Sequence, residues 1–175
     1  IPLRLVGSEM CIRDSYATEL SMAYEEIKLA MDNLEEWMEP IAEKTPLMSM
    51  PGRSYTLFEP MGVTLIISPW NYPFLLAIDP LIGAIAAGNT VILKTSRKSN
   101  HTSSLIHEII NANFDPNYIF VVDNNEVSHD ELLSYNYDHI FYTGGAEVGK
   151  KIMVAASKNL SKVTLEPVSY THLTL

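Results

Sequence analysis

The chain has 175 residues, of which 47% are hydrophobic and 19% charged, a balance typical of a folded domain rather than a disordered segment. Its formal net charge of −9 at pH 7 argues against general affinity for nucleic acid, which requires a basic surface. The sequence contains no run of about 18 consecutive apolar residues, so it predicts no membrane span. We therefore expect a cytoplasmic protein.

The two ends of the chain differ in character from the rest. Residues 1–15 and 167–175 resemble translated sequencing-adapter tails, and we expect both to be foreign to the protein. The single cysteine, Cys11, lies in the first of these segments, so the body offers neither a disulfide nor a thiolate metal site. The five histidines lack metal-ligand spacing, and we expect them to be surface or core residues.

The body begins with a helical pattern. Apolar residues recur at alternating spacings of four and three before Pro40, which predicts an amphipathic helix. We expect this stripe to pack against the domain; it consists of Leu20, Tyr24, Ile27, Met31, Leu34 and Met38. Residues 45–55 contain prolines and a glycine and predict a surface loop. Residues 16–55 thus form an N-terminal helix and connection, and residues 56–166 form the main domain.

Short apolar runs alternate with helical patterns through the main domain. The strands are expected at 63–67, 90–93, 118–122, 139–142 and 162–165, and the helices at 74–87, 101–113, 128–134 and 146–158. This strict alternation predicts an α/β fold, a Rossmann-like parallel five-stranded sheet with helices on both faces. Gly88 suits the end of a helix, and Ser128 with Glu131 forms a capping box.

The segment after the first strand carries a carboxamide between two prolines. Pro69 and Pro73 restrict the backbone on either side of Asn71, so this side chain is expected to be held in place. One interpretation is a reaction site that presents an amide donor. The other is an ordinary loop in which Asn71 caps the next helix. Spacing alone does not separate the two.

A second cluster follows the fourth strand. Gly144, Gly149 and Lys150 fit the skeleton of a phosphate-binding P-loop, whose next residue should be Ser or Thr. That position holds Lys151, and the cluster does not follow the first strand, so an NTPase is disfavoured. The ordinary Gly-x-Gly-x-x-Gly dinucleotide fingerprint after the first strand is also missing.

Four blocks in this order resemble the aldehyde dehydrogenase superfamily, in particular the branch that oxidises long-chain and aromatic aldehydes. They are residues 67–74, 84–94, 139–150 and 163–166. The resemblance runs from about residue 24 to residue 166. It implies NAD or NADP bound by Ser68, Pro69, Trp70, Lys94, Arg97, Gly144, Gly145, Val148 and Gly149, with no metal. It also implies an aldehyde substrate and a homodimeric full-length protein.

The same resemblance implies a catalytic scheme. A cysteine thiolate adds to the aldehyde, Asn71 stabilises the oxyanion, and Glu166 is the base that activates water to release the acid from the thioester. The family continues with Leu-Gly-Gly after this glutamate, whereas this chain has Pro167. The nucleophile is absent from the chain, so we interpret it as an inactive fragment of an NAD(P)-dependent oxidoreductase. A non-catalytic dinucleotide-binding module and an acylating, coenzyme A-dependent enzyme are the alternatives.

Arg97 departs from the family pattern. It matches a position where NAD-preferring members carry a glutamate that accepts hydrogen bonds from the adenosine ribose. A carboxylate there repels a 2′-phosphate, whereas an arginine can pair with it. We therefore predict that NADP is used at least comparably to NAD, unless Arg97 points into solvent.

Overall fold

The structure is a computed structural model that describes residues 15–123 and 126–167. The segments predicted to be foreign, residues 1–15 and 167–175, lie outside this range except for Ser15 and Pro167, so their origin stays a prediction. Cys11 also lies outside the described residues. None of the described helices is both long and apolar enough to cross a lipid bilayer.

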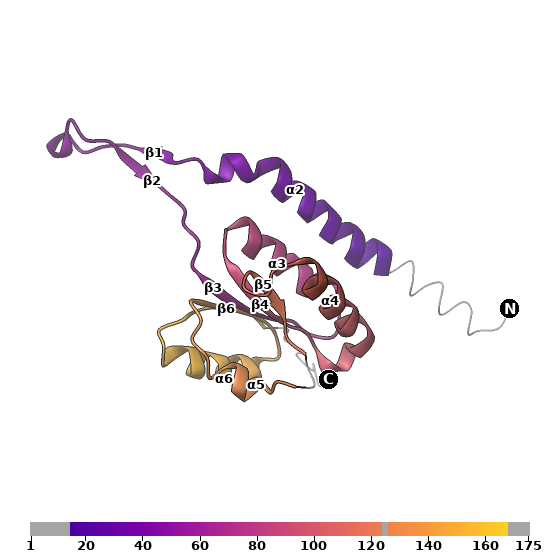
Figure 1. Cartoon of the computed structure of the whole chain (residues 1–175). Coiled ribbons are helices and arrows are strands. Elements are labelled where there is room, and N and C mark those ends of the chain that lie inside the picture. The colour runs from indigo at the N-terminus through magenta and orange to yellow at the C-terminus, as the bar shows by residue number, and fades with distance from the viewer. Residues whose placement is uncertain (1–14, 124–125, 168–175) are drawn as a thin grey trace, which may run out of the picture.

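A parallel five-stranded sheet forms the centre of the main domain, which confirms the predicted fold class (Figure 1). The strand order is β5-β4-β3-β6-β7, so the first strand of this sheet to occur in the sequence, β3, lies in its middle. The strands are β3 (Val63–Ile67), β4 (Thr90–Lys94), β5 (Ile119–Val121), β6 (His139–Gly144) and β7 (Lys162–Pro167). All five predicted strands are present; β5 is shorter than predicted and β6 runs on through Gly144.

Helices cover both faces of the sheet because successive strand residues point to opposite sides. On β3, Ile66 packs in the core beneath α3 (Leu75–Ala86) and α4 (Asn100–Asn113). Its neighbours Leu65 and Ile67 belong to the opposite core, which includes side chains of α5 (His129–Leu132) and α6 (Ala146–Ser157). The four predicted helices are therefore present, although α5 is much shorter than the predicted 128–134.

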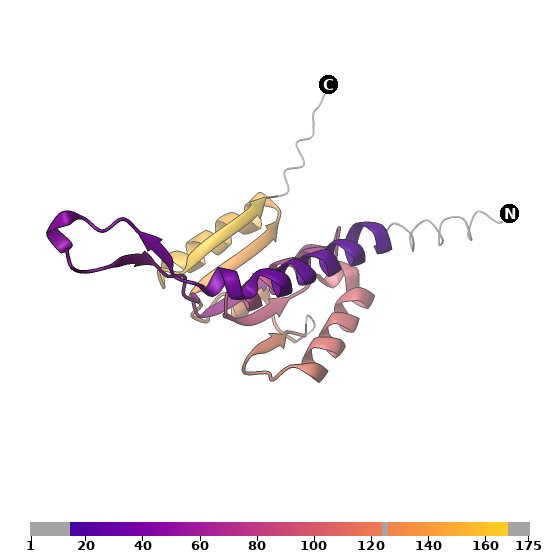
Figure 2. The ribbon, with the colours of Figure 1, turned by 90° about the horizontal axis from the view of Figure 1, so that it is seen from above.

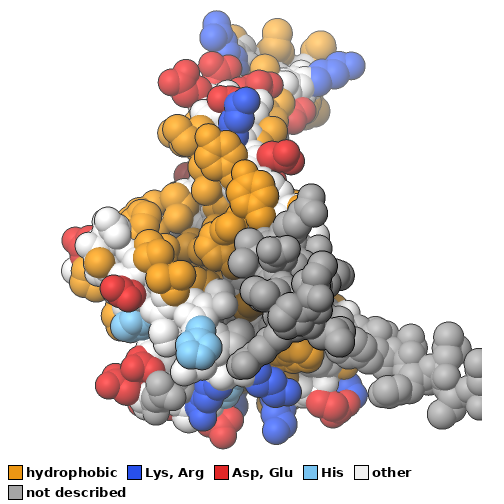
Figure 3. All heavy atoms as spheres, turned by 90° about the vertical axis from the view of Figure 1, so that its right-hand side faces the viewer, with side chains coloured by type: hydrophobic (Ala, Val, Ile, Leu, Met, Phe, Trp, Pro, Cys, Tyr) orange, Lys and Arg blue, Asp and Glu red, His pale blue; other side chains and the backbone are white. Residues whose placement is uncertain are grey.

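The N-terminal helix packs by a different face from the one predicted. A π-helical turn, η1 (Tyr16–Leu20), leads into α2 (Ser21–Met38), which lies against α3. The buried apolar residues of α2 are Ala23 and Ala30, seven residues apart, and their small side chains allow close approach. Most of the predicted stripe is instead turned outward, with Tyr24 71% and Met31 75% exposed, although Leu34 is half-buried. Figure 3 shows hydrophobic side chains gathered across this part of the surface.

The loop predicted over residues 45–55 is part of a projecting hairpin. β1 (Ile41–Glu43) pairs antiparallel with β2 (Ser54–Thr56), and a 3-10 turn, η2 (Leu47–Ser49), lies near the tip. The two views of Figures 1 and 2 show this arm extending away from the sheet. Strands of three residues give too short a pattern for alternation to reveal.

The edge strand β5 is protected by a side chain from α4. The Asn111 carboxamide donates to the carbonyl oxygen of Val121 at 2.9 Å and accepts from its N–H at 2.8 Å. These backbone groups point away from β4 and would otherwise be unpaired at a buried residue.

We expect Asn111→Ala to lower the free energy of unfolding by about 2 kcal/mol, because it leaves a buried donor and a buried acceptor unsatisfied. The matched control is Asn113→Ala on the same helix, whose exposed carboxamide donates only to the carbonyl of Ile109. Urea unfolding measures both. Equal losses in the two variants would contradict the edge-protection role.

Candidate functional site

A pocket lies at the carboxyl ends of the central strands, where the strand order changes direction. After β3 the chain adds β4 and then β5 on one side, and it later adds β6 and β7 on the other. In open α/β sheets this is where ligands bind, because the loops leaving the two adjacent strands diverge. The pocket has a volume of about 540 Å³ and is lined by Ile67, Ser68, Pro69, Trp70, Asn71, Lys94, Thr95, Ser96, Arg97, Lys98, His129, Tyr142, Thr143, Gly144, Gly145 and Val148.

The loop leaving β3 supplies the first wall. The Ser68 N–H donates to the Lys94 carbonyl at 3.0 Å, which continues the β3–β4 pairing by one residue. The Ser68 hydroxyl is buried and has no hydrogen-bond partner among the described residues. Asn71 lines the pocket, while the N-cap of α3 is Phe74 and receives no local side-chain cap. Asn71 is therefore not the cap of the next helix, and its role in a reaction site stays a prediction.

The loop leaving β4 supplies the second wall. Lys94 ends the strand with only 1% of its surface exposed, and its Nζ donates to the Thr95 carbonyl at 3.5 Å. Burial, and then the charge of Arg97, lower the pKa of Lys94 from its ordinary value. Lys98 lies with its Nζ 5.6 Å from the centre of the Trp70 ring, a cation–π contact that joins the two loops.

The turn after β6 supplies the third wall, and its glycines have different roles. A Cβ at Gly144 would collide with the Tyr142 hydroxyl, which donates to the Gly145 carbonyl at 3.1 Å. Gly149 lies outside the pocket and is buried; a Cβ there would make an ordinary contact with Leu165 Cδ1 at 3.5 Å, so the space does not require a glycine. Gly144 and Gly145 thus border the pocket, whereas Gly149 is buried within α6 and does not line it.

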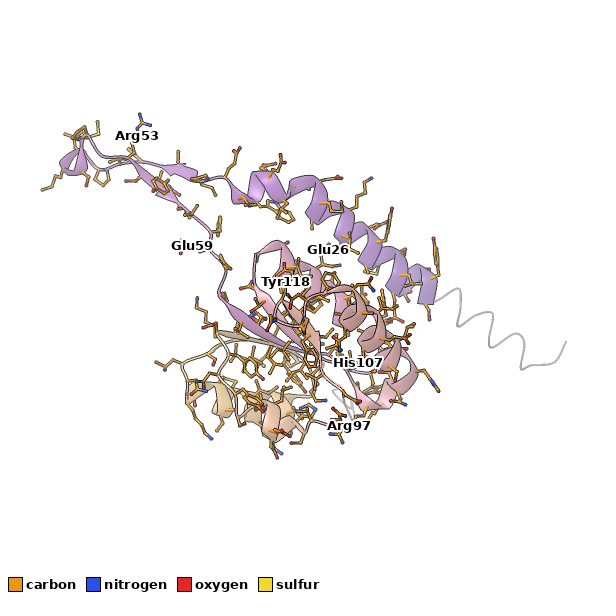
Figure 4. All side chains as sticks on the ribbon, in the orientation of Figure 1. Glu26, Arg53, Glu59, Arg97, His107 and Tyr118 are labelled. Atoms are coloured by element: carbon orange, nitrogen blue, oxygen red, sulfur yellow. The ribbon has the colours of Figure 1, made fainter. Side chains whose placement is uncertain are left out.

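Positive charge gathers in the pocket of an acidic protein. Its lining, taken from the described residues, includes the cationic side chains Lys94, Arg97 and Lys98 together with the imidazole of His129, and no carboxylate. Lys and Arg side chains gather at the bottom of Figure 3, the side on which Figure 4 labels Arg97. Local positive charge and free backbone amides at the start of α6 favour an anionic ligand.

His129 was expected to be an ordinary surface or core residue; it is exposed at the surface and also lines the pocket, which the sequence did not predict. Ser128 accepts a hydrogen bond from the Glu131 N–H at 3.1 Å, as the predicted capping box requires, and this places His129 in the first turn of α5 beside the pocket. Burial, followed by the charges of Lys94 and Arg97, lowers the pKa of His129 from 6.5, against a smaller opposing effect of Asp130. The capping box was the only sequence signal for this placement.

Glu166 is placed apart from the rest of the predicted site. It lies near the end of the edge strand β7, in register with Thr143 on β6, and its side chain is exposed outside the pocket lining. The structure therefore brings together nine of the predicted site residues and leaves out Glu166 and Gly149. Within the described residues, no three His, Cys, Asp or Glu side chains are placed to hold a metal ion.

The fold and the pocket define a doubly wound α/β domain with an anion-favouring site at the strand switch. The model of the aldehyde dehydrogenase family matches residues 9–171. The chain belongs to the aldehyde dehydrogenase family. The match overlaps parts of both terminal segments.

Individual relatives agree with this assignment. The chain is 44% identical over 153 residues to aldehyde dehydrogenase family 3 member H1 of Arabidopsis thaliana, covering 87% of this chain and 32% of the relative. It is also 44% identical to 4,4′-diaponeurosporen-aldehyde dehydrogenase of Staphylococcus aureus, covering 87% and 33%. A solved substrate-bound state of Staphylococcus aureus AldH has a TM-score of 0.83 and 43% identity, covering 88% and 34%. The chain thus spans about a third of the length of these relatives.

The cationic cluster can be tested through the titration of His129. We expect Arg97→Gln to raise the pKa of His129 toward 6.5, because the substitution removes one of the charges that disfavour the imidazolium. Lys158→Gln, which removes an exposed cation at the other end of α6, is the control. NMR titration of the imidazole measures both variants. An unchanged midpoint in Arg97→Gln would show that the two side chains do not interact.

Proposed function

We propose that this chain is the nicotinamide-dinucleotide-binding part of a longer aldehyde dehydrogenase that oxidises an aldehyde to a carboxylic acid. The observation that carries the proposal is the pocket at the strand switch, whose lining combines four basic side chains with Gly144 and Gly145 and contains no described carboxylate. Family membership supports the reaction class. A cytoplasmic location and a homodimeric full-length protein stay predictions.

The residues present fit NAD or NADP. The start of α6 and the glycine turn offer backbone amides to a pyrophosphate. Ser68 offers a buried hydroxyl that lacks a partner among the described residues, and Trp70 and Val148 offer apolar surface. Lys94 would donate to the hydroxyls of the adenosine ribose. When bound, the dinucleotide supplies the hydride acceptor of the reaction.

Two side chains of this chain have proposed catalytic roles. The Asn71 carboxamide would donate to the oxyanion that develops when a cysteine thiolate attacks the aldehyde carbon. Glu166 would take a proton from the water that hydrolyses the resulting thioester. The thiolate is proposed to come from a part of the longer protein not represented in this sequence, so the chain alone is expected to be inactive.

In the longer enzyme, Asn71→Ala is expected to slow acylation by about 100-fold, because it removes a hydrogen bond formed in the transition state. Glu166→Gln is expected to leave acylation intact and to slow deacylation. Stopped-flow kinetics separate the two steps: the Glu166 variant should give a burst of reduced cofactor followed by slow turnover. Loss of the burst without loss of turnover would contradict the role of Glu166.

The 175-residue chain is expected to show no turnover of aldehydes. Its only cysteine, Cys11, lies far upstream of Asn71 in the sequence. The measurement is reduction of NAD⁺ or NADP⁺ with an aliphatic and an aromatic aldehyde. Turnover that disappears on Cys11→Ala would overturn both the assignment of the nucleophile to another part of the protein and the foreign origin of residues 1–15.

Cofactor preference follows from the charge on the β4 loop. We expect the chain to bind NADP⁺ at least as tightly as NAD⁺, because Arg97 and Lys94 can pair with a 2′-phosphate. Arg97→Glu should weaken NADP⁺ binding by about tenfold or more, whereas Lys158→Glu, with the same change in net charge, should not. Titration calorimetry measures all three proteins. A strong NAD⁺ preference that Arg97→Glu leaves unchanged would show that Arg97 does not contact the ribose.

A further inference from the structure

Helix α3 begins without a cap from its own sequence. Its N-cap position is held by Phe74, where Ser, Thr, Asp or Asn is favoured because their oxygens accept hydrogen bonds from the first backbone amides. A phenyl ring offers no such acceptor. The amides of Phe74 and Leu75 therefore need an acceptor from elsewhere in the chain.

Glu19 of η1 provides that acceptor. Its Oε2 accepts from the Phe74 N–H at 2.9 Å and from the Leu75 N–H at 3.2 Å, across separations of 55 and 56 residues. A negative charge is stabilised at a helix N-terminus by the helix dipole, and hydrogen bonds to a carboxylate are stronger than those to a neutral acceptor. The cap thus comes from a segment distant in sequence, held in place where α2 packs on α3.

The burial of Glu19 indicates that this contact is specific. Glu19 is 9% exposed, and it is the only buried acidic side chain among the described residues. The neighbouring Glu25, on α2, is exposed. Burying a carboxylate is costly unless hydrogen bonds compensate, and the two amides of α3 provide them.

The capped amides lie immediately after the loop that carries Asn71. This loop, residues 68–73, is fixed at its start by the Ser68 hydrogen bond to Lys94 and at its end by Glu19. The Leu76 N–H also donates back to the Tyr72 carbonyl at 3.0 Å, which ties the first turn of α3 to the loop. Six residues held at both ends, two of them prolines, have few conformations available.

We propose that Glu19 is a positioning residue: by capping α3 from η1, it holds the 68–73 loop in the conformation that presents Asn71 to the pocket. The catalytic role of Asn71 in this inference rests on the proposed function, whereas the way in which Glu19 holds the loop does not.

The test uses NMR on the 175-residue chain. Glu19→Ala should accelerate hydrogen exchange of the Phe74 and Leu75 amides by about tenfold. It should also increase the motion of the Asn71 backbone and side-chain amides, measured by ¹⁵N relaxation. Glu19→Gln keeps one carbonyl acceptor and should restore both signals in part. Glu25→Ala, a matched change at an exposed glutamate of α2, should match the wild type.

The outcomes separate this inference from the proposed function. Faster amide exchange in Glu19→Ala with unchanged Asn71 relaxation would make Glu19 a stabilising cap only and would overturn the positioning role. The same changes in exchange and relaxation in Glu25→Ala would also overturn it. If Glu19→Ala does not fold, Glu19→Gln decides: faster exchange of the Phe74 and Leu75 amides together with wild-type Asn71 relaxation overturns the proposal. Titration with NAD⁺ and NADP⁺ is a separate measurement. A chain that binds neither would contradict the proposed function without changing the conclusion about how Glu19 affects Asn71.

Discussion

The position of β3 between β4 and β6 is the constraint on which the candidate site depends. From β3 the chain passes through α3 to β4, and from β5 it passes through α5 to reach β6 on the other side of β3. Right-handed crossovers that run in opposite directions across a sheet place their helices on opposite faces of it. The loops after β3 and β6 therefore lead to different faces, and the space between them becomes the pocket.

Charge gives this space its chemical character. The chain as a whole is acidic, yet the described lining of the pocket contains only basic ionisable side chains besides Tyr142. Burial, and to a lesser extent the nearby charge of Arg97, lower the pKa of Lys94. A negative charge placed beside these side chains would favour their charged forms, so the arrangement suits an anionic ligand.

Much of this architecture could be predicted from the sequence because it depends on local patterns. β3 and β4 are dense in β-branched residues, which predicts strands, and the turn around Gly144 lies where a predicted strand meets a predicted helix. The order of these elements therefore predicted which loops border the pocket. The orientation of α2 could not be predicted in this way. Its larger apolar residues made the stronger stripe, but contact with α3 required the small side chains of Ala23 and Ala30. Steric fit between α2 and α3 decides which face of α2 is buried, and the sequence of α2 alone does not reveal that face.

Long-range contacts account for the other features that the sequence did not predict. Nothing near Phe74 indicates that Glu19 caps its helix, since the two are 55 residues apart. The place of His129 at the pocket depends on how α5 packs beneath the sheet, and the β1–β2 hairpin depends on pairing between segments too short to show alternation. Glu166 lies exposed on an edge strand outside the pocket, and its role as a base stays a prediction.

The most direct test of the account is to map the binding of NADP⁺ onto the chain by NMR chemical-shift perturbation. The account predicts that the largest changes fall on the three loops at the strand switch, including the amides of Ser68, Thr95 and Gly145, with little change on the β1–β2 hairpin or the exposed face of α2. Saturable binding with its largest changes elsewhere, or no binding of NADP⁺ or NAD⁺ by the folded chain, would contradict the assignment of this pocket.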